Sequence, residues 1–103
     1  MEDEHKACEV ASALLQSDSG YLDKILKLNA LGNSIHGQVW ETEFHIFGVI
    51  ASDTDHLPTE KVRKYCSENM LKKSDLEIEE TIKYYKSQVV SACNAILSKY
   101  QNV

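Results

Sequence analysis

Hydrophobic residues recur at steps of three and four in the C-terminal third of the chain. The stripe consists of Ile78, Ile82, Tyr85, Val89, Cys93, Ile96 and Tyr100. This spacing places the side chains on one face of an α-helix. Ser74-Asp75-Leu76-Glu77 has the form of a capping box, in which serine and glutamate side chains bind free backbone N–H groups. The pattern therefore predicts a long amphipathic helix from about Ser74 to Gln101.

Two shorter helices are predicted in the N-terminal third. The first ends at Leu15 or Gln16, and its stripe of small side chains is Ala7, Val10, Ala11 and Leu14. The second begins near Gly20, and its inward-facing residues are Tyr21, Leu22, Ile25, Leu28 and Leu31. We expect it to stop at Gly32-Asn33, because both residues tolerate positive φ.

The centre of the chain allows two interpretations. The residues Trp40, Phe44, Phe47 and Ala51 fit helical steps, which favours a helix. A short strand over residues 44–51 is the alternative, because Phe44, Ile46 and Ile50 also alternate at even spacing. A shorter helix follows Pro58, with Thr59 as its N-cap and Val62, Tyr65 and Cys66 inward. Helices joined by short polar turns predict an all-α fold, a single domain over residues 1–103 built as an antiparallel bundle of four to five helices.

Length and charge restrict the possible functions. A chain of 103 residues forms one domain, and its apolar content of 43% is typical of a soluble globule. The formal net charge of -5 disfavours a nucleic-acid partner, because phosphate backbones attract excess cations. The acidic start MEDEHKACEV does not fit a secretory leader, and the apolar run 46–51 is far shorter than a membrane span of about 20 residues. We expect neither nucleic acid nor membrane as a partner.

The chain contains three cysteines, Cys8, Cys66 and Cys93. Their number is odd, and no two of them have C-x-x-C spacing. This pattern is typical of reduced thiols in a cytoplasmic protein. Each cysteine has apolar neighbours at helical spacing, so we interpret all three as small core residues.

The segment Ser52-Asp53-Thr54-Asp55-His56 lies just before the only proline, Pro58. Ser, Asp and Thr side chains bond their own backbone, which favours a turn between two helices. The alternative is a metal or acid–base site built from Asp53, Asp55 and His56. Against it, no two histidines have the i, i+4 spacing of a helical zinc site, and the chain contains no nucleophile-elbow or phosphate-loop motif. We therefore expect no enzyme, no metal and no cofactor.

A cluster of basic residues follows the proline: Lys61, Arg63, Lys64, Lys72 and Lys73. A solvated helix face is the favoured interpretation of this cluster, and a contact with an acidic partner is the alternative. Tyr84, beside Lys83, is a candidate interface residue, because tyrosine is enriched at protein contacts.

Several short stretches resemble a small bacterial helical family whose biochemical function is uncharacterised. They are Phe44-x-x-Phe47, SDTDHLP at 52–58, Val62-Arg63-Lys64, LKKSDLEIEE at 71–80 and Ala92-Cys93. The resemblance implies that residues 52–58, Arg63 and Lys73 form the distinctive surface of the family. It implies neither a substrate nor a partner.

These observations favour a non-enzymatic protein-binding or accessory module that engages a protein partner or a second copy of itself. By analogy of size and charge, an immunity-like or inhibitor-like role is one form of this function. The alternative is a small-molecule-binding domain with a pocket between helices, lined by Trp40, Phe44, Phe47 and Tyr85. The candidate ligand or partner surface consists of Trp40, Phe44, Phe47, Asp53, Asp55, His56, Arg63 and Lys73.

Overall fold

The computed structural model describes residues 2–17, 19–58 and 60–101, and every regular element in them is an α-helix. The helices are α1 (Glu2–Gln16), α2 (Tyr21–His36), α3 (His45–Asp53), α4 (Glu60–Arg63) and α5 (Glu68–Tyr100). The prediction of an all-α fold with four to five helices is confirmed. Residues 45–51 are helical, with Phe44 as the N-cap of α3, and not the alternative strand.

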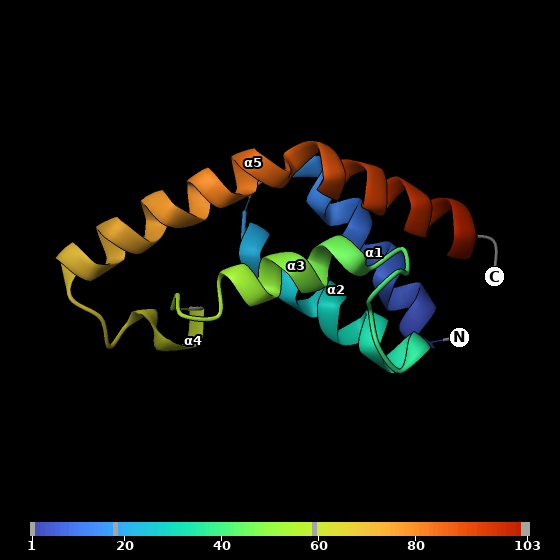
Figure 1. Cartoon of the computed structure of the whole chain (residues 1–103), viewed down its shortest axis with the longest axis horizontal. Coiled ribbons are helices and arrows are strands. Elements are labelled where there is room, and N and C mark those ends of the chain that lie inside the picture. The colour runs from blue at the N-terminus through green and yellow to red at the C-terminus, as the bar shows by residue number, and fades with distance from the viewer. Residues whose placement is uncertain (1, 18, 59, 102–103) are drawn as a thin grey trace.

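Helix α5 runs along the whole length of a molecule that measures 45 × 23 × 22 Å (Figure 1). Helix α1 packs against α2 and α5, and α3 packs against α2 and α5. The C-terminal half of α5 lies over α1, whereas its N-terminal half projects beyond the other long helices with α4 beneath it (Figure 1). We call residues 60–84, which comprise α4, the turn after it and the first half of α5, the arm.

The predicted apolar stripes form the core. Ala7 and Ala11 of α1 are fully buried, and their small side chains allow the neighbouring helices to approach closely. On α5 the stripe is buried at Val89, Cys93, Ile96 and Tyr100, and its three earlier members are partly buried against the same core. The stripe therefore continues from the core into the arm, where fewer helices cover it.

Helix α5 begins seven residues earlier than the capping box predicts. Its N-cap is Ser67, whose side-chain oxygen accepts a hydrogen bond from the N–H of Met70 at 3.2 Å. Ser74 is a buried residue inside the helix, so its assignment as the N-cap was wrong. The residues before it, Leu71-Lys72-Lys73, are good helix formers, and nothing between Ser67 and Ser74 interrupts the helix.

The predicted end of α2 at Gly32-Asn33 is also wrong. The helix continues to His36 and ends at Gly37, whose φ of 81° suits glycine and whose N–H donates to the Asn33 carbonyl oxygen. Gly32 lies inside the helix for a packing reason. A Cβ atom there would lie 2.6 Å from Cβ of Phe44, so only glycine permits this approach of the chain before α3.

Val39, in the loop between α2 and α3, is a core residue that the sequence analysis did not identify. It is 3% exposed and fits between two glycines, because a Cβ on Gly32 or Gly48 would lie 2.8 or 2.6 Å from its methyl groups. Trp40, which was expected on the same face as Phe44, lies outside α3 and is 49% exposed. Its ring packs edge-on against His45.

Helix α4 is a single turn, shorter than expected. Val62 and Tyr65 are 46% and 78% exposed, so their predicted inward orientation is wrong, whereas Cys66 is partly buried. Because the arm projects beyond α1 and α2, these two helices do not cover α4 (Figure 1). The proposed N-cap, Thr59, lies outside the described residues.

Candidate functional site

The segment before Pro58 ends α3 and fastens the chain to α5. Thr54 is buried, and both its N–H and its hydroxyl donate to the carbonyl oxygen of Ile50, at 3.0 and 2.7 Å. These two bonds satisfy the Ile50 carbonyl group in the last turn of the helix. Thr54 therefore has the local backbone role that the turn interpretation predicts.

The carboxylates and the imidazole of this segment point to different partners. Asp53 accepts a hydrogen bond of 2.6 Å from the Tyr85 hydroxyl, which raises the pKa of Tyr85. Nε2 of His56 lies 2.9 Å from the Glu77 carboxylate, while its Nδ1 lies 3.8 Å from Asp55. Among the described residues, no group of three or more His, Cys, Asp and Glu side chains has a geometry that could hold a metal ion.

Two of the predicted site residues do meet. His56 and Lys73 both line an open hollow of about 440 Å³ between the segment before α4 and the first half of α5. Its walls are formed by His56, Leu57, Pro58, Asn69, Met70, Lys73, Ser74 and Glu77. The hollow therefore combines an imidazole, an ammonium group and apolar side chains.

Arg63 does not line this hollow. Its guanidinium donates two hydrogen bonds to the two carboxylate oxygens of Asp75, at 2.7 and 3.1 Å, and these bonds lower the pKa of Asp75. Such a two-bond pair is geometrically specific. It ties α4 to α5 and thereby holds the shape of the arm.

Phe44 and Phe47 cannot belong to a partner surface. Both are 0% exposed, and their ring centroids lie 6.3 Å apart inside the core. Trp40 is on the outside of the loop, and Tyr85 is bound to Asp53 on α3. The four aromatic residues of the alternative, small-molecule-binding interpretation therefore lie in different environments.

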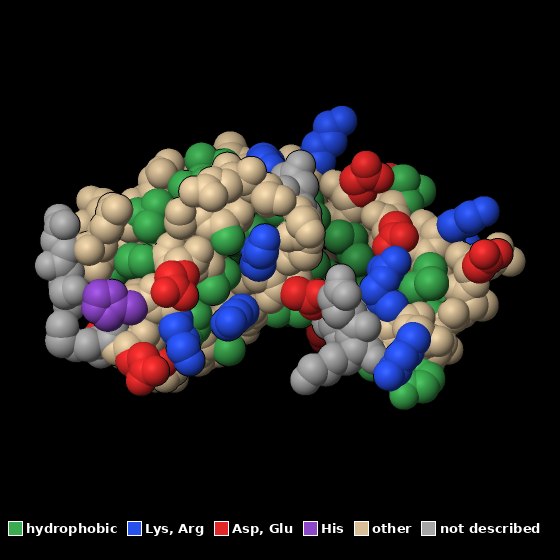
Figure 2. Space-filling view, turned by 180° about the vertical axis from the view of Figure 1, so that it is seen from behind, with side chains coloured by type: hydrophobic (Ala, Val, Ile, Leu, Met, Phe, Trp, Pro, Cys, Tyr) green, Lys and Arg blue, Asp and Glu red, His purple; other side chains and the backbone are tan. Residues whose placement is uncertain are grey.

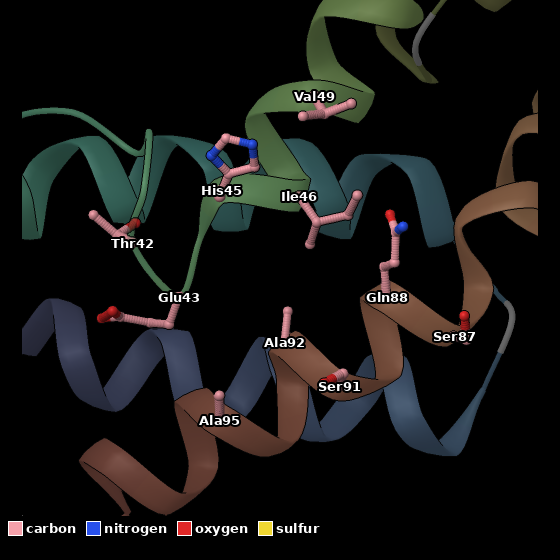
Figure 3. A pocket seen from close by; sticks show the side chains of 10 residues that line it. All are labelled: Thr42, Glu43, His45, Ile46, Val49, Ser87, Gln88, Ser91, Ala92 and Ala95. Carbon is pink, nitrogen blue, oxygen red and sulfur yellow. The ribbon is translucent and has the colours of Figure 1, made fainter.

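A groove that no sequence pattern indicated lies between α3 and α5 (Figure 3). It is open to solvent, encloses about 690 Å³ and is lined by Thr42, Glu43, His45, Ile46, Val49, Ser87, Gln88, Ser91, Ala92 and Ala95. Ile46 points into it from α3, and Gln88 and Ala92 point into it from α5 (Figure 3). The small residues of α5 leave the space between the two helices unfilled.

Glu43, at one end of the groove, is the centre of a polar cluster. Its side chain is only 10% exposed and accepts hydrogen bonds from the Tyr100 hydroxyl at 2.5 Å, from Nε2 of His36 at 2.7 Å and from the Lys99 ammonium group at 3.3 Å. Burial acts to raise the pKa of Glu43, but these hydrogen bonds outweigh it and lower the pKa to about 2. Burial and the Glu43 carboxylate raise the pKa of Tyr100.

This cluster joins the loop between α2 and α3 to α2 and to α5. The Glu43 carboxylate already accepts three donors. Nδ1 of His45 accepts the backbone N–H of Glu41 at 3.0 Å and so supports a residue with a φ of 63°. Glu43 and His45, the two titratable residues that line the groove, therefore each have a hydrogen-bond partner within the chain. Glu43 is separated from its three partners by 7, 56 and 57 positions along the chain, so no local sequence pattern reveals the cluster.

Exposed apolar side chains gather on the arm. They are Val62, Tyr65, Met70, Leu76 and Tyr84, each between 46% and 78% exposed. Figure 2 shows hydrophobic side chains between Lys or Arg and Asp or Glu side chains on this part of the molecule, on the right of the view. Tyr84 packs edge-on against Tyr85, so one ring of this pair faces solvent and the other faces Asp53.

Comparisons of the chain with protein-family models, with curated proteins and with solved structures find no match. The resemblance to a bacterial helical family stays a prediction. Within the described residues, no helix is both long and apolar enough to cross a membrane.

Proposed function

We propose that the protein is a non-enzymatic protein-binding module, in which an antiparallel helical bundle carries the arm and the arm engages a partner protein. The distribution of exposed apolar side chains carries this proposal. Of the seven large hydrophobic side chains that are exposed among the described residues, five lie on the arm. Their concentration on the arm supports an interaction site there, because exposed apolar patches mark such sites.

The tip of the arm, formed by Val62, Tyr65 and Met70, is the best candidate for the contact. Tyrosine and methionine are enriched in protein interfaces. Met70 also lines the hollow of about 440 Å³, so an apolar side chain of the partner has a place beside it. His56 and Lys73 supply a polar rim to this hollow, which suits an interface with an apolar centre.

Three polar contacts lie within the arm or next to the point where it joins the rest of the chain. They are the Arg63–Asp75 pair, the His56–Glu77 contact and the hydrogen bond from Tyr85 to Asp53. Two of them join α5 to the segment before α4 or to α3, and the other joins α4 to α5. A partner would therefore meet a surface that is already formed, which lowers the entropic cost of binding.

The proposal includes an immunity-like or inhibitor-like role as one form of partner binding. The three free thiols support the accompanying proposal that the protein works in the cytoplasm. Glu43 and His45 already form hydrogen bonds within the chain, which supports a non-enzymatic role for the groove.

Site-specific photo-crosslinking in the cells that express the protein tests this proposal. A photoreactive amino acid replaces Tyr65 or Met70 on the arm, and Leu15 of α1, 39% exposed, is the matched control position. We expect one defined partner to be crosslinked from both arm positions and not from the control position. With that partner purified, Tyr65→Ala and Met70→Ala should each weaken binding by about ten-fold or more, as anchor residues do.

Equal crosslinking from Leu15 and the arm would contradict the proposal. Unchanged affinity in both alanine variants, with unchanged helical content by circular dichroism, would contradict it as well.

A further inference from the structure

The outer face of the arm carries a stripe of seven exposed residues along the first half of α5. They are Asn69, Lys72, Lys73, Leu76, Glu79, Glu80 and Lys83, and all seven are exposed. Steps of three and four place them on one side of the helix. The opposite side carries Leu71, Ser74 and Ile78, which are buried or partly buried, so the middle of the stripe faces away from the molecule. Its edges adjoin two hollows, one beside Pro58 and one beside Tyr21.

The charges of this stripe are arranged symmetrically around Leu76 with opposite sign. Three positions away on either side lie Lys73 and Glu79, and four positions away lie Lys72 and Glu80. Leu76 itself, 58% exposed, is the one large apolar side chain of the stripe. A surface of this kind is complementary to itself when a second copy is turned by a two-fold axis, as in an isologous contact.

We propose that a second copy of this chain binds the outer face of the arm, with the two α5 helices antiparallel and the two Leu76 side chains in contact at the two-fold axis. In this pairing Lys73 faces Glu79 of the second copy, and Lys72 faces Glu80 of the second copy. The reciprocal contacts follow from the symmetry. A parallel pairing would instead place lysine against lysine and glutamate against glutamate, which is unfavourable.

The charges of the stripe are available for this contact. Among the residues that the structure describes, none of Lys72, Lys73, Glu79 and Glu80 makes an ion pair within the chain. The acidic residues directly beside Leu76 would approach their counterparts in the second copy, but each already has a partner in its own chain. Asp75 binds Arg63, and Glu77 contacts His56. The pairing therefore leaves no like charges facing each other without a counter-charge.

The size of the stripe predicts a weak and salt-sensitive dimer. Its seven residues extend over 15 positions of the chain, from Asn69 to Lys83, or about 21 Å of helix axis. A single apolar side chain per copy and exposed ion pairs place such a contact at the small end of specific interfaces, among transient assemblies. The proposal extends the proposed function, on whose arm it rests, to a face that leaves Val62, Tyr65 and Met70 at the tip and shares Lys73 with the rim of the hollow.

Sedimentation equilibrium of the purified chain with charge-reversed variants tests the pairing. At concentrations up to about 1 mM and at about 0.05 M salt, the wild type should approach the mass of a dimer, and about 0.5 M salt should weaken association by about ten-fold or more. The variants Lys72→Glu/Lys73→Glu and Glu79→Lys/Glu80→Lys should each be monomeric alone. Their mixture should form a heterodimer, and the variant with all four changes should recover the homodimer.

A matched control separates this pairing from the effect of net charge. Lys6→Glu/Lys27→Glu reverses two exposed lysines on α1 and α2 and changes the net charge by as much as the first variant. It should dimerise within about two-fold of the wild type, since it leaves the stripe intact. All substituted side chains are exposed, and circular dichroism verifies that each variant is folded.

A wild type that stays monomeric at low salt would overturn the pairing. So would a dimer that survives in either half-reversed variant, or a mixture that associates no better than its components. None of these results touches the proposed function, since crosslinking from Tyr65 and Met70 reports a different protein at a different face. Conversely, a confirmed homodimer without any crosslinked partner would refute that function and leave the pairing of α5 intact.

Discussion

The contact of Val39 with Gly48 leads to a quantitative prediction. In Gly48→Ala the new Cβ would lie 2.6 Å from a methyl group of Val39 and 3.3 Å from the ring of Trp40. Overpacking of this kind costs about 1–3 kcal/mol, whereas replacing glycine by alanine inside a helix stabilises by about 1 kcal/mol. The net effect on the free energy of unfolding should be a loss of up to about 2 kcal/mol.

The same substitution should have the opposite sign in a Val39→Ala background. That change removes the methyl group closest to the new Cβ, and the half-exposed ring of Trp40 has room to move. Gly48→Ala should then stabilise the protein by up to about 1 kcal/mol, through helix propensity alone. The coupling energy between the two substitutions should therefore be about 1–3 kcal/mol.

Urea unfolding of the four proteins of this cycle, followed by far-UV circular dichroism, measures the coupling. Gly32→Ala is the matched control, because its Cβ would still lie 2.6 Å from Cβ of Phe44 after Val39 is shortened. It should destabilise the protein in both backgrounds. Additivity of Gly48→Ala and Val39→Ala within about 0.5 kcal/mol would refute the reasoning.

Three further predictions concern the polar cluster, the arm and the core thiol. The pKa of Glu43 lies at about 2 in the folded state against an ordinary 4.5, so its contribution to stability is present above pH 4.5 and lost as the pH falls towards 2. Urea titrations should show the wild type losing at most about 3 kcal/mol relative to Glu43→Gln over this range, and parallel profiles would contradict the cluster. Asp75→Asn removes the charge that Arg63 binds, so hydrogen exchange should accelerate in α4 while α1 is unchanged; equal exchange in α4 would show that the pair does not hold the arm. Cys93 is fully buried and its thiol pKa is raised to about 11, so it should react with Ellman's reagent only as fast as the protein unfolds, and immediate labelling would disprove its burial.

The parts of the fold that were predictable are those in which local pattern and packing agree. The stripe of α5 gives the correct buried face because hydrophobic periodicity of this length has one helical solution. The end of α2 was misplaced because Gly32 and Gly37 look alike as helix stops in sequence. Only the approach of Phe44 distinguishes the glycine that makes room from the glycine with positive φ.

The candidate site was less predictable than the fold. The exposure of Tyr65 depends on where α4 lies relative to the other helices, and no residue near Tyr65 carries that information. The bond between Glu43 and Tyr100 joins residues 57 positions apart. The residues of the self-complementary stripe around Leu76 can be read from the sequence. That they lie on one exposed helix face depends on the start of α5 at Glu68 and on the exposure of every stripe residue, which only the structure gives.

Because α5 is one uninterrupted helix, the orientation of its core residues fixes the orientation of the arm about the helix axis. A helix advances by about 100° and 1.5 Å per residue, so one residue inserted between Tyr85 and Val89 would turn the whole first half of the helix by more than a quarter of a circle. Asp75 would then swing away from Arg63, and Leu76 would leave the outer side of the molecule. An insertion of seven residues, about two full turns, would instead restore nearly the original facing and carry the arm outward by about 10 Å. Lengths of this helix compatible with the fold should accordingly recur in steps of whole turns.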